Sequence, residues 1–150
     1  MKEPAVTNST CLIGLERIGR LDILHQLFET VMIPPKVQEE FGKAVNWLVV
    51  IAPKNTVLVQ VLSTIVDEGE AEAIALAKEQ NCLLVLDDRK ARHWAKSFGL
   101  RIIGTAGLLV RAKRQGIVEE VKPILENLKQ SNFRLHPSLE REVLRLAGEE

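Results

Sequence analysis

The sequence has few cysteines and no long apolar run, and both absences exclude classes of protein. The two cysteines, Cys11 and Cys82, belong to no CxxC pair and to no Cys/His cluster with the spacing of a zinc site. Two isolated cysteines are also too few for a disulfide-stapled secreted scaffold, so we expect a reduced, cytoplasmic protein. The N-terminus lacks the apolar run of a signal peptide, and no stretch of about 18 uncharged apolar residues could span a membrane. We therefore expect no membrane segment.

The chain also lacks an excess of charge of either sign. It has 20 Lys and Arg against 20 Asp and Glu, so its formal net charge is zero. A polyanion would have to be attracted by a local basic surface, because the whole molecule has no positive field. With 150 residues, of which 46% are hydrophobic, the chain can fill one core. These values indicate a single domain over residues 1–150, with a helical extension from about residue 118.

Short apolar runs alternate with amphipathic segments along the chain. The runs that predict strands are 6–7, 31–33, 47–51, 82–86 and 100–103, although 47–51 also fits a buried helix segment. The segments with helical spacing are 12–18, 21–28, 36–41, 70–80, 88–98, 105–115 and two more after residue 118. Residues 55–66 give no clear pattern. Such alternation is typical of an α/β fold with a parallel sheet.

Side chains with oxygen donors follow the predicted strands or lie on the helices between them. They belong to Asn8, Glu40, Glu70, Glu72, Asp87 and Asp88. In an open parallel sheet the ligand crevice lies beyond the carboxyl ends of the strands, where Asn8, Asp87 and Asp88 fall. Carboxylates and carboxamides, with no histidine or thiol among them, are the ligands that Mg²⁺ or Mn²⁺ prefers.

Helical geometry separates neighbouring glutamates. Glu40 lies beside the apolar face that includes Val37, whereas Glu39 points away from that face. Glu70 and Glu72 differ by about 200° around a regular helix, so both cannot point at one site. The spacing of the alanines and leucines that follow slightly favours Glu70.

The predicted helix after Asp88 has one apolar face and one basic face. The basic side chains are Arg89, Arg92, His93 and Lys96. A basic stripe that begins beside an acidic pair would hold a phosphate backbone next to a metal site. A solvated helix surface is the more common explanation of such a stripe, and helix capping is sufficient to explain Asp87 and Asp88, so both interpretations stay open.

Several short motifs, taken together in their order and spacing, resemble the PIN-domain superfamily. They are residues 6–13 (VTNSTCLI), 33–41 (IPPKVQEEF), 69–77 (GEAEAIALA), 84–88 (LVLDD) and 104–107 (GTAG). The chain looks most like a poorly characterised prokaryotic branch related to VapC-type toxin ribonucleases, over about residues 6–128. The resemblance implies a three-layer α/β/α sandwich with a central parallel sheet. It also implies a Mg²⁺ or Mn²⁺ site that hydrolyses phosphodiester bonds in RNA.

The resemblance assigns roles to individual residues. The metal ligands that it implies are Asn8, Glu40, Glu72, Asp87 and Asp88, and the four acidic ones among them would carry catalysis. The resemblance places a small hydroxyl residue at Thr10, which would support the site together with Glu70 and Thr105. The basic stripe found from the helix spacing, Arg89, Arg92, His93 and Lys96, would bind RNA. The family places its third acid at Glu72 where the helix spacing favours Glu70, and both are kept, with Glu72 first because helix phase is least reliable in the opening turn. Asn8 departs from the family, because its amide oxygen can bind a cation but carries no charge.

Two functions from different classes follow from this resemblance. The first is a metal-dependent endoribonuclease that forms a homodimer and acts as the toxin of a toxin–antitoxin pair, with an antitoxin protein as partner. The second is a PIN-like scaffold that binds RNA or a protein without cutting, because Asn8 weakens its site. A nucleotide-binding α/β domain is a third hypothesis, but the chain lacks the glycine-rich phosphate loop such domains use.

Overall fold

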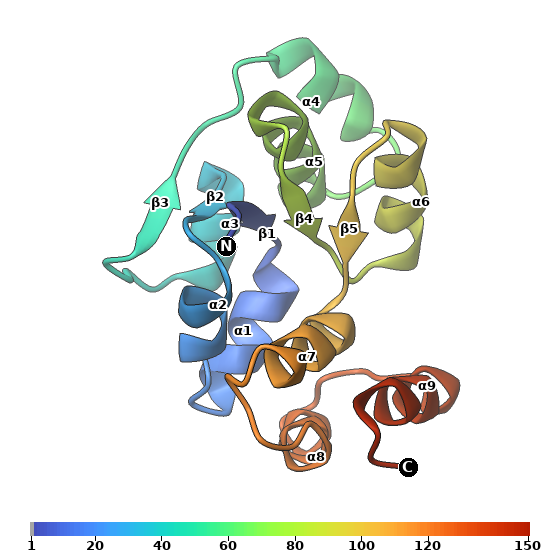
Figure 1. Cartoon of the computed structure of the whole chain (residues 1–150). Coiled ribbons are helices and arrows are strands. Elements are labelled where there is room, and N and C mark those ends of the chain that lie inside the picture. The colour runs from blue at the N-terminus through green and yellow to red at the C-terminus, as the bar shows by residue number, and fades with distance from the viewer. Residues whose placement is uncertain (1) are drawn as a thin grey trace.

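A sheet of five short parallel strands forms the centre of residues 2–150, the part of the chain that the computed structural model describes (Figure 1). The strands are β1 (Ala5–Thr7), β2 (Val31–Ile33), β3 (Leu48–Val50), β4 (Leu83–Val85) and β5 (Ile102–Ile103). Their order across the sheet is β3-β2-β1-β4-β5, and every neighbouring pair is parallel. The α/β class and the parallel sheet predicted from the sequence are therefore confirmed.

Helices connect the strands and continue beyond the last one. They are α1 (Ser9–Arg17), α2 (Asp22–Leu27), α3 (Pro35–Phe41), α4 (Thr56–Leu62), α5 (Glu68–Gln80), α6 (Arg89–Ser97), α7 (Thr105–Arg114), α8 (Lys122–Gln130) and α9 (Pro137–Ala147). The run 47–51 contains a strand and no helix, which settles the ambiguity of its apolar pattern. Residues 55–66, which gave no clear pattern, contain α4, and the side chain of Asn55 caps its first turn.

Alternate residues of the strands pack into two different cores. Ala5 and Leu83 face one side of the sheet, whereas Val6 and Leu84 face the other. Buried residues of α1, α2, α3, α7, α8 and α9 contribute to the first core, and those of α4, α5 and α6 to the second. The molecule thus has helices on both faces of the sheet, as the resemblance implies (Figure 1).

The C-terminal helices pack on the first core through residues such as Leu125 and Val143. The end of the chain is held by Glu149, whose carboxylate accepts hydrogen bonds from the backbone N–H groups of Val121 (2.8 Å) and Lys122 (2.9 Å). The same carboxylate pairs with the ammonium of Lys113 at 2.9 Å. Within residues 2–150, no helix is both long and apolar enough to cross a membrane.

Candidate functional site

The carboxyl ends of β1 and β4 bring Asn8 close to the aspartate pair. Thr7 and Val85 are partners across the two strands, and the N–H of Asn8 donates to the carbonyl of Val85 at 3.1 Å. Asn8 is only 4% exposed, and its side-chain Oδ1 accepts the N–H of Cys11 at 3.1 Å. Asn8 therefore caps α1, and this role is compatible with a second contact to a cation because an amide oxygen has two lone pairs.

A hollow of about 20 Å³ lies next to Asn8. Its lining residues are Asn8, Ser9, Thr10, Val37, Glu40, Asp67, Gly69 and Glu70. They come from the first turns of α1 and α5, from the side of α3 and from the residue that caps α5. A space of this size holds about one water molecule or one ion of similar size. The side-chain donors around it are all oxygens, which suits a hard cation.

Gly69 allows the carboxylate of Glu40 to lie against the first turn of α5. A Cβ at Gly69 would be 2.5 Å from Oε1 of Glu40 and 3.1 Å from Oε2, so any side chain there would displace this carboxylate. Among residues 2–150, Glu40 has no hydrogen-bond or ion-pair partner. Its two oxygens therefore remain available for a ligand.

Glu70 and Asp67 form a capping box at the start of α5. The N–H of Glu70 donates to Oδ1 of Asp67 at 2.8 Å, and the N–H of Asp67 donates to Oε1 of Glu70 at 3.2 Å. This motif explains why the helix begins two residues before the predicted position. Burial raises the pKa of Glu70 to about 7, and the charges of Asp67 and Asp88 add to the effect. A cation bound here would relieve this crowding of negative charge.

Glu72 lies away from the hollow. Its Oε1 accepts the backbone N–H of Lys36 at 3.1 Å, in the first turn of α3. The structure therefore brings Glu70 together with Asn8 and Glu40, and it gives Glu72 the different task of capping a neighbouring helix. Helix spacing separates the two glutamates in the same way, whereas the family resemblance places the third acid at Glu72.

Asp87 is held by the start of α7. Its two carboxylate oxygens accept the N–H of Thr105 at 2.8 Å and the hydroxyl of Thr105 at 2.7 Å. Gly104 lacks a Cβ, which would lie 2.8 Å from Nη1 of Arg92 and 3.3 Å from Oδ1 of Asp87. Thr105 and Gly104 thus fix the direction in which the Asp87 carboxylate points.

Asp88 directly precedes α6, and the basic stripe lies on this helix. One oxygen of Asp88 accepts the N–H of Ala91 at 3.0 Å, so Asp88 caps this helix. Arg92 turns back and donates to the carbonyl of Leu86 at 2.9 Å, which leaves it half-buried. The other members of the stripe, Arg89, His93 and Lys96, are exposed. The stripe is therefore not uniform, since Arg92 supports the end of β4.

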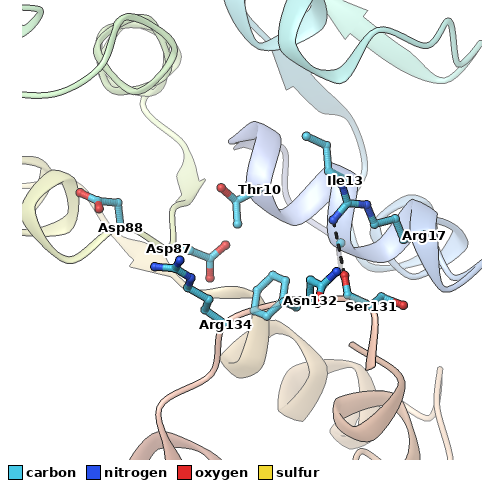
Figure 2. A pocket seen from close by; sticks show the side chains of 10 residues that line it. Thr10, Ile13, Arg17, Asp87, Asp88, Ser131, Asn132 and Arg134 are labelled. Atoms are coloured by element: carbon cyan, nitrogen blue, oxygen red, sulfur yellow. Dashed lines mark hydrogen bonds between the residues drawn. The ribbon is translucent and has the colours of Figure 1, made fainter. Parts of the chain in front are cut away.

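A larger pocket, of about 500 Å³, lies beside the aspartate pair (Figure 2). Its lining residues are Thr10, Ile13, Gly14, Arg17, Asp87, Asp88, Ser131, Asn132, Phe133 and Arg134. Figure 2 shows Thr10 and Asp87 directed into the same space as Arg134, which comes from the segment between α8 and α9. The sequence analysis missed Arg17 and Arg134, because only folding brings them next to the acidic motifs.

Thr10 lines both cavities, so the small hollow and the large pocket adjoin each other. Across residues 2–150, no three His, Cys, Asp or Glu side chains are grouped closely enough to hold a metal ion by themselves. A cation at this site would thus complete its shell with water and with oxygens of a ligand. Mg²⁺ sites are commonly of this kind, with one or two carboxylates and the phosphate of a substrate.

Comparisons with known proteins agree with this fold. The sequence matches the family model DUF3368, described as a PIN domain, over residues 4–149. The structure is similar to that of a PilT N-terminus domain protein from the hyperthermophilic archaeon Sulfolobus solfataricus P2, with a TM-score of 0.50 and 21% sequence identity. This similarity covers 78% of the present chain and 95% of the other chain, and it concerns the fold alone. No curated protein matches the sequence.

Proposed function

The chain belongs to the PIN domain family, whose members are typically nucleases, and on this premise we propose that it is a metal-dependent endoribonuclease. One observation carries the proposal. A hollow lined by oxygen donors, large enough for one ion, adjoins a pocket large enough for part of a substrate, and Thr10 belongs to both. This juxtaposition is what metal-assisted hydrolysis of a phosphodiester requires, because the ion and the scissile phosphate must be neighbours.

The oxygen-only donor set suits Mg²⁺ or Mn²⁺. In the proposal, Glu40, Glu70 and Asn8 hold the cation from the side of the hollow, and Asp88 and Asp87 face it from the side of the pocket. Glu70 takes the place that the resemblance gives to Glu72, since Glu72 is engaged with Lys36. When bound, the cation would lower the pKa of a water molecule and neutralise charge on the phosphate oxygens.

The protein's own residues orient the reacting groups and hold the cation. Thr105 holds Asp87 with two hydrogen bonds, so this carboxylate is directed before the substrate binds. Burial raises the pKa of Glu70 to about 7, and a cation held by Glu70 would stabilise the charged form of this carboxylate. Asp87 is our candidate for the group that orients the attacking water, because Thr105 already fixes the direction of its carboxylate.

A calorimetric Mn²⁺ titration tests the proposal first, because metal binding is required before any cleavage. We expect saturable binding by the wild type and its loss in Glu40→Gln and Asp88→Asn. Glu39→Gln is the matched control, since Glu39 lies on the same helix and pairs with Lys36 outside the hollow. The same variants would then be assayed for cleavage of a mixed pool of single-stranded RNA. If the wild type neither binds Mn²⁺ in the presence of RNA nor cleaves the pool, the proposal of nuclease activity is wrong.

The second candidate, a scaffold that binds RNA or a protein without cutting, is favoured by Asn8. Its amide carries no charge and already caps α1. Asn8→Asp discriminates between the candidates, because Asp also caps helices well and restores a negative charge. Faster cleavage in this variant supports a weakened nuclease. Retained RNA binding with no cleavage, in both the variant and the wild type, supports the scaffold.

A toxin role extends the nuclease proposal to the cell. Expression of an active toxin would arrest growth, and Asp88→Ala would relieve the arrest without lowering the amount of protein. Arrest that persists in Asp88→Ala would exclude a catalytic toxin. An antitoxin partner, a homodimer and a cytoplasmic location belong to this same proposal.

A further inference from the structure

Two arginines without a carboxylate partner line the larger pocket. Arg17 extends from α1, and Arg134 from the segment that joins α8 to α9 (Figure 2). Within the described residues 2–150, neither guanidinium forms an ion pair, whereas Arg101, Arg111 and Arg145 each pair with a glutamate. The two guanidiniums therefore have hydrogen-bonding capacity left for an anion in this concave site.

The segment that carries Arg134 is fixed against α1. Phe133 packs where α1 has Gly14, and a Cβ at Gly14 would lie 2.8 Å from Cδ2 of Phe133. Arg17 also donates a hydrogen bond to the carbonyl of Ser131 at 3.4 Å. These contacts order the wall of the pocket before a ligand arrives, which reduces the entropic cost of binding.

We propose that this pocket binds a nucleotide of single-stranded RNA, with one phosphate held by Arg134 near Asp87 and a neighbouring phosphate held by Arg17. The proposal rests on the proposed function, because it identifies the part of the substrate that lies beside the acidic hollow. A pocket of about 500 Å³ is within the size range of sites for small organic ligands, and thus large enough for one nucleotide. A base must leave its stack to enter such a pocket, which favours a single strand over a duplex.

The apolar lining distinguishes RNA from an acidic peptide. Ile13 and Phe133 line the pocket together with the two arginines. Phosphates alternate along RNA with bases whose flat faces pack well on apolar and aromatic side chains. A run of acidic peptide side chains offers charge without such surfaces. The combination of guanidinium groups and apolar surface therefore fits a nucleotide chain.

The experiment measures binding of a fluorescein-labelled oligouridylate to the full chain, by fluorescence anisotropy, in EDTA and in parallel with Ca²⁺. We expect Arg17→Ala and Arg134→Ala each to weaken binding about 10-fold, because each removes a charge-assisted hydrogen bond. The dependence of log affinity on log salt concentration should also become shallower by about 0.7 for each phosphate that is no longer neutralised. Arg141→Ala is the control, since it removes the same charge from an exposed position on α9 outside the pocket and should change neither quantity.

Each outcome supports or overturns the pocket assignment. Wild-type affinity in the Arg17→Ala/Arg134→Ala double variant overturns it, as does the absence of RNA binding in both buffers. A labelled oligoglutamate that binds as tightly as RNA, through the same two arginines, overturns it in favour of a protein partner. Circular dichroism and thermal melting verify that the variants fold.

Failure of the proposed function gives a different result. RNA binding that depends on both arginines, without cleavage in Mg²⁺ or Mn²⁺, would support the assignment of the pocket to a nucleotide and exclude the nuclease activity. Metal-dependent cleavage with unchanged KM in the double variant would exclude RNA binding through the two arginines of the pocket and would support the nuclease activity.

Discussion

The small hollow and the large pocket share Thr10, yet their polar side chains contribute differently to the fold. Around the hollow, Asn8 caps α1, and Asp67 and Glu70 cap α5. In the pocket, Arg17 makes one long hydrogen bond, to a backbone carbonyl, and among residues 2–150 Arg134 makes none. Oxygen donors for a cation are thus also structural groups, whereas the guanidiniums are available to a ligand. Substitutions in the two regions should therefore separate stability from binding.

Asp87 and Arg134 both line the pocket, so substituting them compares a side chain that stabilises the fold with one that is available to a ligand. Asp87→Ala removes two hydrogen-bond acceptors from the fully buried Thr105. We expect the free energy of unfolding to fall by about 2–3 kcal/mol, and cleavage to be lost. Arg134→Ala should change the free energy of unfolding by less than about 0.5 kcal/mol, since the Arg134 side chain is exposed. Urea unfolding measures the free energy of unfolding of both variants. Equal losses of stability in Asp87→Ala and Arg134→Ala would contradict the division between structural and ligand-binding side chains.

Gly69→Ala offers the opposite separation, a loss of binding without a loss of stability. The new Cβ would displace the Glu40 carboxylate, which lies 2.5 Å from its position. Displacing a ligand in this way is expected to weaken Mn²⁺ binding about 10–100-fold. Stability should stay the same or rise by up to about 1 kcal/mol, because alanine is the better helix former.

Glu68→Ala is the control for Gly69→Ala in the Mn²⁺ titration. Glu68 belongs to the same first turn, is exposed and lies outside the hollow. Its removal should leave Mn²⁺ affinity within about 2-fold, since surface charges a distance away are screened by solvent. Equal weakening by both variants would mean that the general negative charge of the turn, and not Glu40, attracts the cation.

The fold was largely predictable from local pattern, since each strand is a short apolar run and each helix except α4 is a periodic segment. Helix phase separates Glu70 from Glu72 and favours Glu70, whereas the family resemblance places the third acid at Glu72. The sequence analysis did not identify Asp67, which stands at the end of a segment with no clear pattern. Asp67 and Glu70 nevertheless have the spacing of a capping box, and that signal could have located the helix start.

The pocket was much less predictable than the fold. Arg17 and Arg134 are far apart in the sequence, and neither lies in a motif with a recognisable spacing. They meet because Phe133 packs against α1 at Gly14. A glycine inside a helix pattern often marks a close approach of this kind, but it does not say which segment approaches. The partner is decided by tertiary packing.

The pH dependence of stability sharpens the description of the hollow. The pKa of Glu70 rises from its ordinary value of 4.5 to about 7 in the folded protein, so the folded state binds a proton more tightly than the unfolded state. The stabilisation is complete below pH 4.5 and is lost as the pH rises through 7. In EDTA, we expect the melting temperature to fall over this interval. Glu70→Gln should flatten the curve, because Gln keeps the capping box without the charge.

Thermal melts over a pH series measure this effect. Parallel curves for the wild type and Glu70→Gln would show that Glu70 does not titrate in the interval. Added Mn²⁺ provides a second readout that links the hollow to a cation. A bound cation favours the charged carboxylate, so Mn²⁺ should raise the melting temperature of the wild type most above neutral pH.

Glu149 has a smaller effect on the pH dependence of stability, and its sign is opposite to that of Glu70. Burial opposes its charge, but the N–H groups of Val121 and Lys122 and the ammonium of Lys113 outweigh burial and lower the pKa of Glu149. Its stabilisation is therefore present above the ordinary pKa and is lost as the pH falls through the lowered value. Glu149→Gln should lower the melting temperature by about 2–4 °C near neutral pH, corresponding to about 1 kcal/mol, and by less in acid.

The same variant tests how independently the pocket wall is held. Glu149 fixes the end of the chain, whereas the segment with Arg134 is fixed by Phe133 and α1. RNA affinity in Glu149→Gln should therefore stay within about 2-fold of the wild type, because both arginines still neutralise their phosphates. A decrease as large as that of Arg134→Ala would mean that α9 and its terminal hydrogen bonds position the arginine, and that the pocket depends on the whole C-terminal extension.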